Sequence, residues 1–230
     1  ALNLQEEWVW HVKGMRFPDV NQVDEIEKYS AIKLFIERAQ RVQRDFVPER
    51  EQACIIRVCR LVGGMPLAIE LAATWLKRLT CADVANEIER NLDFLTTRMR
   101  NVPERHRSMR AVFEHSWNLL EQDEREVFKQ CAIFRGGFRR EAAESVAGAS
   151  LFTLSSLVDK SLLRVTPTGR YEIHELLRQF AEEKLDETAG AKESTHDRHC
   201  EYFADYLHVR QDNSRNAHQV EFMEEIGADI

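Results

Sequence analysis

The run from Leu163 to Ile173, LRVTPTGRYEI, decides the fold of this chain. Its residues alternate between polar and apolar on both sides of Pro167-Thr168-Gly169, a pattern typical of a β-hairpin closed by a tight turn. The flanking residues have helical spacing instead, which predicts helices over 151–162 and 174–185. A small hairpin set among helices indicates a mainly α fold.

Further helices are expected before the hairpin, at 108–120, 123–134 and 140–147. Gly136-Gly137 and Gly148 separate these segments, since glycine commonly marks turns and helix ends. Several helices, then a two-stranded wing and a closing helix, is the order of elements in a winged-helix domain. The polar stretch at 103–107 predicts the boundary before this domain.

The N-terminal half predicts a compact helical bundle, with helices expected at 30–46, 49–62, 66–79 and 80–95. Ser30 and Thr80 are expected to cap the first and the fourth helix, because their hydroxyl oxygens can accept a backbone N–H. Gly63-Gly64 suits the left-handed end of the second helix. Pro66 suits the first turn of the third helix, where its missing N–H is no loss.

The two ends of the chain differ from this pattern. Residues 2–12 are rich in β-formers and predict a short strand. Because a strand cannot begin a domain without neighbours, we interpret the chain as an internal part of a larger protein. Apolar residues recur at helical spacing over 195–207 and again over 220–226, which predicts the first helices of a repeated array.

The composition narrows the class of function. The chain has 230 residues, of which 43% are hydrophobic, enough for one sizeable core or for several small ones. Its formal net charge of −7 gives no general attraction to phosphate backbones or to anionic lipid. Binding to nucleic acid or to a membrane is therefore not expected.

The cysteines and the absence of a targeting signal predict a cytoplasmic protein. The cysteines are odd in number and scattered, mostly among apolar residues: Cys54, Cys59, Cys81, Cys131 and Cys200. This pattern favours reduced, buried thiols over a disulfide framework, and the spacing matches no metal site. The sequence contains no run of about 18 apolar residues and does not begin with a signal peptide.

Several motifs resemble one family of proteins. The segment Gly63–Ala73 (GGMPLAIELAA) is similar to the Gly-x-Pro motif of the STAND ATPases, which include apoptotic protease-activating factors, plant disease-resistance (NB-ARC) proteins and bacterial multidomain regulators. The segments Phe134–Phe138, Leu157–Leu163 and Tyr171–Ala181 resemble the winged-helix part of the bacterial branch. Within the last of them, Ile173–Glu175 (IHE) falls where the family has its Met-His-Asp motif.

The resemblance covers nearly the whole chain and implies four parts: the end of a nucleotide-binding domain at 1–18, a helical bundle domain at 19–103, a winged-helix domain at 104–186 and the start of a tetratricopeptide-like repeat at 187–230. The loop Gly-x-x-x-x-Gly-Lys-Ser/Thr and the acidic pair for magnesium are absent from the sequence, and the family carries them upstream. The chain alone is therefore not expected to be an enzyme, whereas the intact protein is expected to be a slow ATPase switch.

The resemblance also implies a site for ADP or ATP, with magnesium in the intact protein. Pro66 corresponds to a proline that packs on the adenine ring, and Gly64 permits close approach of the backbone. His174 corresponds to a histidine that contacts the β-phosphate of ADP. The residues alone favour a simpler interpretation, in which Pro66 is only a helix-start proline and His174 a structural residue at a strand–helix junction, and the resemblance favours the nucleotide contacts instead. Ile173 and Glu175 depart from the family's Met and Asp, and the longer carboxylate alters the helix start.

These sites predict a regulatory lid and relay that holds ADP in a closed state and rotates as a rigid body when ATP replaces it. The expected partners are the protein's own upstream nucleotide-binding domain and its downstream repeats. Assembly with further copies of the same protein is expected in the ATP-bound state.

Two other functions stay open. A winged helix can bind DNA directly, but the helix at 151–162 offers only Lys160, offset by Asp159, and acidic and basic residues are balanced across the domain. A protein-interaction scaffold would keep the nucleotide motifs without using them. His196 and His199 could share a metal ion, although no further ligands stand near them in the sequence.

Overall fold

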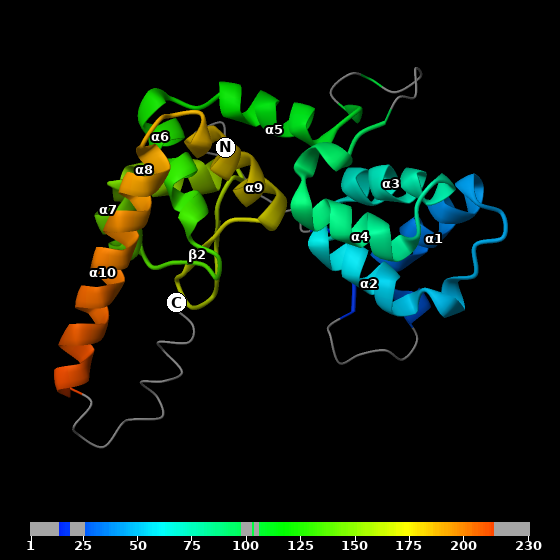
Figure 1. Ribbon diagram of the computed structural model, residues 1–230, viewed down its shortest axis with the longest axis horizontal. Helices are drawn as coiled ribbons and strands as arrows, with labels where there is room; N and C mark the ends of the chain where they lie inside the picture. Colours follow the sequence, from blue (N-terminus) through cyan, green and yellow to red (C-terminus); the bar gives the residue numbers. More distant parts are fainter. Residues whose placement is uncertain (1–13, 19–25, 98–102, 104–105, 214–230) are drawn as a thin grey trace, which may run out of the picture. The chain divides into compact units, whose positions relative to one another are not determined.

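The computed structural model describes residues 14–18, 26–97, 103 and 106–213 (Figure 1). This part of the chain is mainly α with one small antiparallel hairpin, which confirms the predicted fold class. None of its helices combines the length and the apolar character of a membrane span.

The chain divides into two compact units between Asn118 and Leu119. The strand predicted at 2–12 and the helix predicted at 220–226 lie outside the described residues. The functional divisions assigned after residues 18, 103 and 186 stay predictions.

The first unit is a helical bundle that consists of the 3-10 helix η1 (Ile26–Lys28), α1 (Ser30–Val42), η2 (Pro48–Arg50), α2 (Gln52–Leu61), α3 (Pro66–Thr74), η3 (Trp75–Lys77), α4 (Cys81–Arg90), η4 (Leu92–Phe94) and α5 (Met109–Asn118). Helix α1 packs against α3, and α2 packs against α4, as can be followed in Figure 1. The four helices predicted between residues 30 and 95 are therefore present, with shorter bounds.

Helix α3 lies in the core of this unit and buries Ala68, Ile69, Leu71, Ala72 and Ala73. It ends at Thr74 rather than near Leu79, because the chain tightens into η3 where Trp75 docks on Phe94. The indole N–H of Trp75 donates to the carbonyl of Phe94 at 2.8 Å, and the two rings stack with centroids 4.7 Å apart. This side-chain anchor holds the helix end against η4.

The helix starts partly agree with prediction. Thr80 caps α4 as expected, since its hydroxyl oxygen accepts the backbone N–H of Asp83 at 3.2 Å. Ser30 does not cap α1: the helix already begins at this residue, and its hydroxyl oxygen accepts the N–H of Arg16 at 3.1 Å. Ser30 thus ties the incoming segment to α1.

The prediction of five reduced thiols is wrong for one pair. Cys54 and Cys81 form a disulfide across α2 and α4, with their Cα atoms 6.0 Å apart. They stand 27 positions apart in the sequence, so only the packing of the two helices brings them together. Cys59 and Cys131 are buried free thiols, and Cys200 is an exposed one.

The second unit consists of α6 (Gln122–Gln130), η6 (Cys131–Ile133), α7 (Arg140–Ala147), α8 (Leu151–Asp159), β1 (Arg164–Val165), β2 (Tyr171–Glu172), α9 (Glu175–Asp186) and α10 (Ala191–Asn213). Helix α6 packs against α8 and α9, while α10, orange in Figure 1, packs against α7 and α9. The core contains Phe128, Phe138, Leu154, Leu157 and Phe180, all at most 2% exposed. The order of helices, hairpin and closing helix is the one predicted.

The hairpin confirms the decisive sequence pattern. Strands β1 and β2 pair antiparallel, with Arg164 opposite Glu172 and Val165 opposite Tyr171. Phe138 adds an isolated bridge to the free side of Tyr171, with both N–H···O distances 2.8 Å. Helix α8 ends at Asp159, three residues before its predicted end, because the chain reverses at Ser161, whose φ is 59°.

Candidate functional site

The Gly63-Gly64 turn of the first unit holds the segment 14–18 by direct backbone contact. Both glycines are left-handed, with φ of 56° and 66°. The N–H of Met15 donates to the carbonyl of Gly64 at 2.8 Å. A Cβ on Gly64 would overlap the carbonyl oxygen of Met15, and a Cβ on Gly14 would overlap that of Gly63. The turn is therefore a close crossing of two backbones.

The sequence predicted that Gly64 lets the backbone approach a ligand closely. It did not predict the contact of the turn with Gly14 and Met15. The structure shows that Gly64 is buried and that its open face is filled by Met15. The available signal was Gly14 itself, because two glycine sites often mark a close approach of two backbone segments. Gly64 consequently shapes the site and anchors the entering segment.

Pro66 is the first residue of α3, two positions after this turn, and its ring is exposed. The missing N–H of proline is without cost at this position, since the first N–H groups of a helix have no partner within it. The rest of α3 is fixed in the core. The first unit therefore presents an exposed apolar ring on a rigid support.

His174 belongs to the second unit and caps α9 directly after β2. Its Nδ1 accepts the backbone N–H of Leu176 at 3.2 Å. A ring nitrogen that accepts cannot carry the proton, so the neutral ring carries it on Nε2. His174 therefore has a structural role as the cap of α9, and its contact with phosphate stays a prediction.

A charged network continues along α9 from His174. Arg178, whose side chain is 10% exposed, donates from Nε and Nη2 to the two carboxylate oxygens of Glu175, both at 2.8 Å. Its Nη1 donates to Glu182 at 2.8 Å and to the carbonyl of Ala132 at 3.4 Å. The longer side chain of Glu175, compared with the family's Asp, is thus occupied by Arg178.

The network fixes the charges of these groups. Burial opposes ionisation of Glu175, but the hydrogen bonds and charge of Arg178, together with Gln179 and the charge of Arg135, outweigh it, so the pKa of Glu175 lies below its ordinary value. Glu182 has a lowered pKa because burial is likewise outweighed, in this case by Arg178 and Lys192. Both carboxylates are ionised at neutral pH.

A pocket of about 240 Å³ lies beside this network. Its lining combines apolar and charged side chains: Ala132, Ile133, Arg135, Arg178, Glu182, Leu185, Lys192 and His196. Arg178 and Lys192 already pair with carboxylates, Lys192 with Glu182 and Asp186. His174 does not line this pocket, so the pocket is not the predicted phosphate site.

His199 has a packing role. Its ring lies between Phe134 and Phe203, with centroid distances of 5.4 and 4.7 Å. Burial, and secondarily the charge of His196, lowers the pKa of His199. In the described part of the chain, His196 and His199 join no third ligand.

Helix α8, which would read DNA in a winged-helix protein, carries no basic residue. Its exposed side chains include Leu151 and Phe152, the latter 87% exposed. Lys160, just beyond its end, is bound by both carboxylate oxygens of Glu124 at 2.7 and 2.6 Å. The helix thus presents an apolar rather than a cationic face.

Comparisons with known proteins relate the chain to regulators. No protein-family model matches it. The chain is 32% identical over 229 residues to a Mycobacterium tuberculosis protein named as an HTH-type transcriptional regulator, an alignment that covers 95% of this chain and 25% of that protein. It is 32% identical over 143 residues to the regulatory protein AfsR of Streptomyces coelicolor, covering 57% of this chain and 14% of AfsR.

The chain is also similar in sequence to a plant protein. Disease resistance protein RPP4 of Arabidopsis thaliana is 28% identical over 144 residues, covering 61% of this chain and 11% of RPP4. The chain therefore spans a quarter or less of the length of these three relatives. It is similar to segments of bacterial regulatory proteins and of a plant disease-resistance protein.

Proposed function

We propose that this chain is the regulatory lid and relay of a STAND-type nucleotide switch. The observation that carries the proposal lies in the first unit. The exposed Pro66 follows the Gly63-Gly64 turn, which binds segment 14–18 through its backbone. The Gly63-Gly64 turn binds segment 14–18 and leads directly to the exposed ring of Pro66. This arrangement is suited to cover one face of a nucleotide that an upstream domain binds. Similarity to bacterial regulators and to a disease-resistance protein supports this class of function.

In this proposal Pro66 covers the adenine ring and Gly64 sets its position. The left-handed Gly64 directs the chain from α2 into α3, and the buried body of α3 prevents the proline from moving. Apolar rings that cover one face of a ligand are common in nucleotide-sized pockets.

His174 supplies the contact to phosphate. Its Nδ1 accepts the N–H of Leu176, which places the proton of the neutral ring on Nε2. The start of α9 also favours an anion because of the helix dipole. Arg178 pairs with Glu175, so the carboxylate that follows His174 in sequence repels a diphosphate less than an unpaired one would. ADP bound in this way holds the closed state, and exchange for ATP releases it.

The partners in this proposal are the upstream nucleotide-binding domain, which would supply the phosphate loop and magnesium, and the downstream helical repeats. The ATP-bound protein would assemble with further copies of itself. The chain itself performs no catalysis in this scheme.

The test is the nucleotide content of the purified full-length protein that contains this chain. The protein is denatured, and the released nucleotides are separated by anion exchange. We expect about one ADP per chain. A folded protein that carries no nucleotide would contradict the proposal and favour an interaction scaffold.

Two substitutions at one position separate phosphate contact from helix capping. His174→Asn retains an acceptor for the N–H of Leu176 but removes the ring donor, whereas His174→Leu removes both. We expect both variants to lose ADP, with His174→Leu also less stable. The control is His115→Leu, since His115 is an exposed histidine on α5. ADP occupancy unchanged in both His174 variants would exclude the phosphate contact.

A second candidate function is direct DNA binding, which the name of the Mycobacterium tuberculosis relative favours. The acidic chain and the apolar face of α8 oppose it. A gel shift of the purified chain with duplex DNA at low and high salt tests this alternative. A salt-sensitive complex would favour the DNA-binding candidate over the lid.

A further inference from the structure

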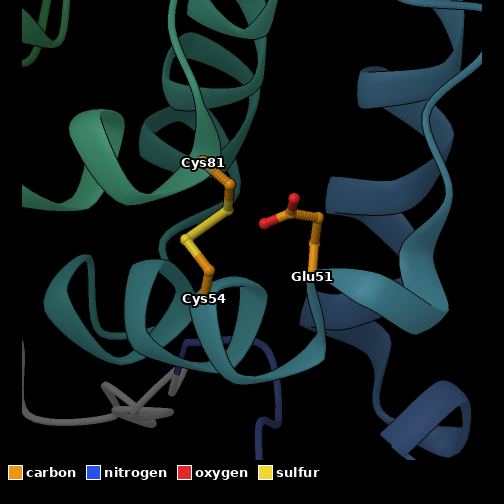
Figure 2. A group of neighbouring side chains, drawn as sticks. All are labelled: Glu51, Cys54 and Cys81. Atoms are coloured by element: carbon orange, nitrogen blue, oxygen red, sulfur yellow. A yellow bond between two sulfur atoms is a disulfide. The ribbon is translucent and has the colours of Figure 1, made fainter.

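Three side chains of the first unit that can bind a metal meet between α2 and α4. Figure 2 shows the Cys54–Cys81 disulfide with the carboxylate of Glu51 directed toward it. One ligand atom from each of Glu51, Cys54 and Cys81 lies within 4.8 Å of the others. Glu51 and Cys54 are half-buried and Cys81 is buried, so the cluster lies at the edge of the core.

Both cysteines stand at helix starts. Cys54 lies in the first turn of α2, which begins at Gln52, and Cys81 is the first residue of α4. The positive end of a helix dipole stabilises a thiolate, and thiolates are the form that binds metals. Cys59 lies in the interior of α2 and not at its start. Burial raises the pKa of its thiol to about 12, so this thiol stays protonated at neutral pH.

The carboxylate of Glu51 distinguishes the cluster from a simple cross-link. Within the described residues it makes no hydrogen bond and no ion pair. A carboxylate adds nothing to an S–S bond, and beside two thiolates it would be repelled unless a cation lay between them. One carboxylate and two sulfurs form a donor set suited to Zn²⁺.

We propose that, when the disulfide is reduced, Glu51, Cys54 and Cys81 bind one Zn²⁺ ion, and that the disulfide and the metal are alternative clasps between α2 and α4. Two sulfurs at about 2.3 Å from a shared tetrahedral zinc stand about 3.8 Å apart. The Cα separation of 6.0 Å therefore needs only side-chain adjustment to pass from one clasp to the other. Water completes the fourth position.

A dithiol can reduce the Cys54–Cys81 disulfide. Two electrons and two protons pass from the reductant to the Cys54–Cys81 bond; the reductant becomes a disulfide and the cluster becomes two thiols. Zn²⁺ then displaces the two thiol protons and binds both thiolates. This inference concerns the first unit alone and does not rest on the proposed nucleotide site.

The experiment uses the whole chain in reduced and oxidised form. The reduced chain is prepared with a phosphine, freed of reagent without oxygen, and titrated with Zn²⁺ against a chromophoric chelator. We expect one tightly bound Zn²⁺ per reduced chain and none in the oxidised chain. Co²⁺ substituted for Zn²⁺ should give the absorption of thiolate–cobalt charge transfer.

Variants locate the site. Cys54→Ser and Cys81→Ser should each weaken Zn²⁺ binding by about 100-fold, and Glu51→Gln, which leaves both thiols in place, by about tenfold. Cys200→Ser, which removes an exposed thiol elsewhere, should change nothing. Far-UV circular dichroism checks that each variant is folded.

Two results would overturn the proposal. A reduced wild-type chain that binds no Zn²⁺ would make the pair a redox cross-link alone. Equal Zn²⁺ affinity in wild type, Cys54→Ser and Glu51→Gln would place any bound metal elsewhere on the chain.

Discussion

The two candidate contacts lie at two helix starts that are built in different ways. At α3 the turn is shaped by backbone sterics: Gly63 and Gly64 are left-handed, and Met15 crosses against Gly64. At α9 the start is built from side chains: His174 caps the helix, and Arg178 joins Glu175 and Glu182.

This difference predicts opposite sensitivities. A steric crossing depends on the absence of atoms and responds little to pH or salt. A network of ionised groups depends on protonation and loses strength when its carboxylates are neutralised. The first site should therefore be sensitive to side-chain volume, and the second to charge.

The two units can be followed separately in solution. The described tryptophans, Trp75 and Trp117, belong to the first unit, and the sequence has no tryptophan after residue 118, so indole fluorescence carries no direct signal from the second unit. Far-UV circular dichroism reports on the helices of both units.

The largest effect is expected for Gly64→Ala. The new Cβ would overlap Met15 in a left-handed backbone, so the free energy of unfolding should fall by about 4 kcal/mol. The control is Gly148→Ala, where φ is 62° but nothing lies within 4 Å of a Cβ, and the cost should be about 1 kcal/mol. Urea unfolding is followed by tryptophan fluorescence for Gly64→Ala and by circular dichroism for Gly148→Ala. Equal losses would show that the crossing adds nothing beyond the backbone angle.

Next in size is Arg178→Met. This change removes the bonds to Glu175, Glu182 and the carbonyl of Ala132, and we expect a loss of about 2 kcal/mol in the second unit.

A surface pair provides the matched control for Arg178. Arg140→Met affects a side chain that is 52% exposed and 3.9 Å from Glu144, so it should change stability by at most about 0.5 kcal/mol. Thermal unfolding by circular dichroism compares the two variants, and equal stabilities would contradict a structural role for the Arg178 network.

A smaller effect concerns pH. Burial opposes ionisation of Glu124, but hydrogen bonds from Lys160, Ser156 and the backbone N–H of Glu121, with the charge of Lys160, lower its pKa. A carboxyl with a lowered pKa in the folded state stabilises fully above its unfolded pKa and loses this contribution as pH falls through its folded pKa. The wild-type second unit should therefore lose stability as the pH drops below about 4.5.

Glu124→Gln tests that assignment. At neutral pH the variant should be less stable than wild type by about 1 kcal/mol, and the gap should close in acid. Glu141→Gln, an exposed residue of α7, serves as the control and should keep the wild-type pH profile. A gap that stays constant from neutral pH into acid would show that charge at Glu124 is not the cause.

An effect similar in size to that of Glu124→Gln is expected for the loss of the α9 cap. His174→Leu should lower stability by about 1 kcal/mol, while His174→Asn should stay within about 0.5 kcal/mol of wild type because its amide oxygen can accept the N–H of Leu176. Urea unfolding followed by circular dichroism measures both. A stable Leu variant would mean that the Nδ1 bond contributes nothing.

Much of the fold was predictable because its signals are local. The hairpin around Pro167–Gly169, the left-handed Gly63-Gly64, Pro66 at a helix start and the Thr80 cap all depend on residues close in sequence. Helix ends were predicted less well. Helix α3 stops where Trp75 meets Phe94, a contact between residues 19 apart, which periodicity does not register.

The candidate site divides in the same way. His174 was predictable as a residue at the start of a helix, but its bond to Leu176 and the role of Arg178 required the structure. The spacing of the cysteines predicted reduced thiols. This prediction was wrong for Cys54 and Cys81, because disulfide formation depends on the distance between helices.

The sequence by itself determined the mainly α class, the place of the hairpin and the helix starts at Pro66 and His174, because turns, caps and hydrophobic periods act over a few residues. Only the tertiary structure decided that Met15 fills the open face of Gly64 and that Cys54, Cys81 and Glu51 meet. These are contacts between segments far apart in the chain. They follow from how helices pack, and packing depends on the shapes of both partners at once.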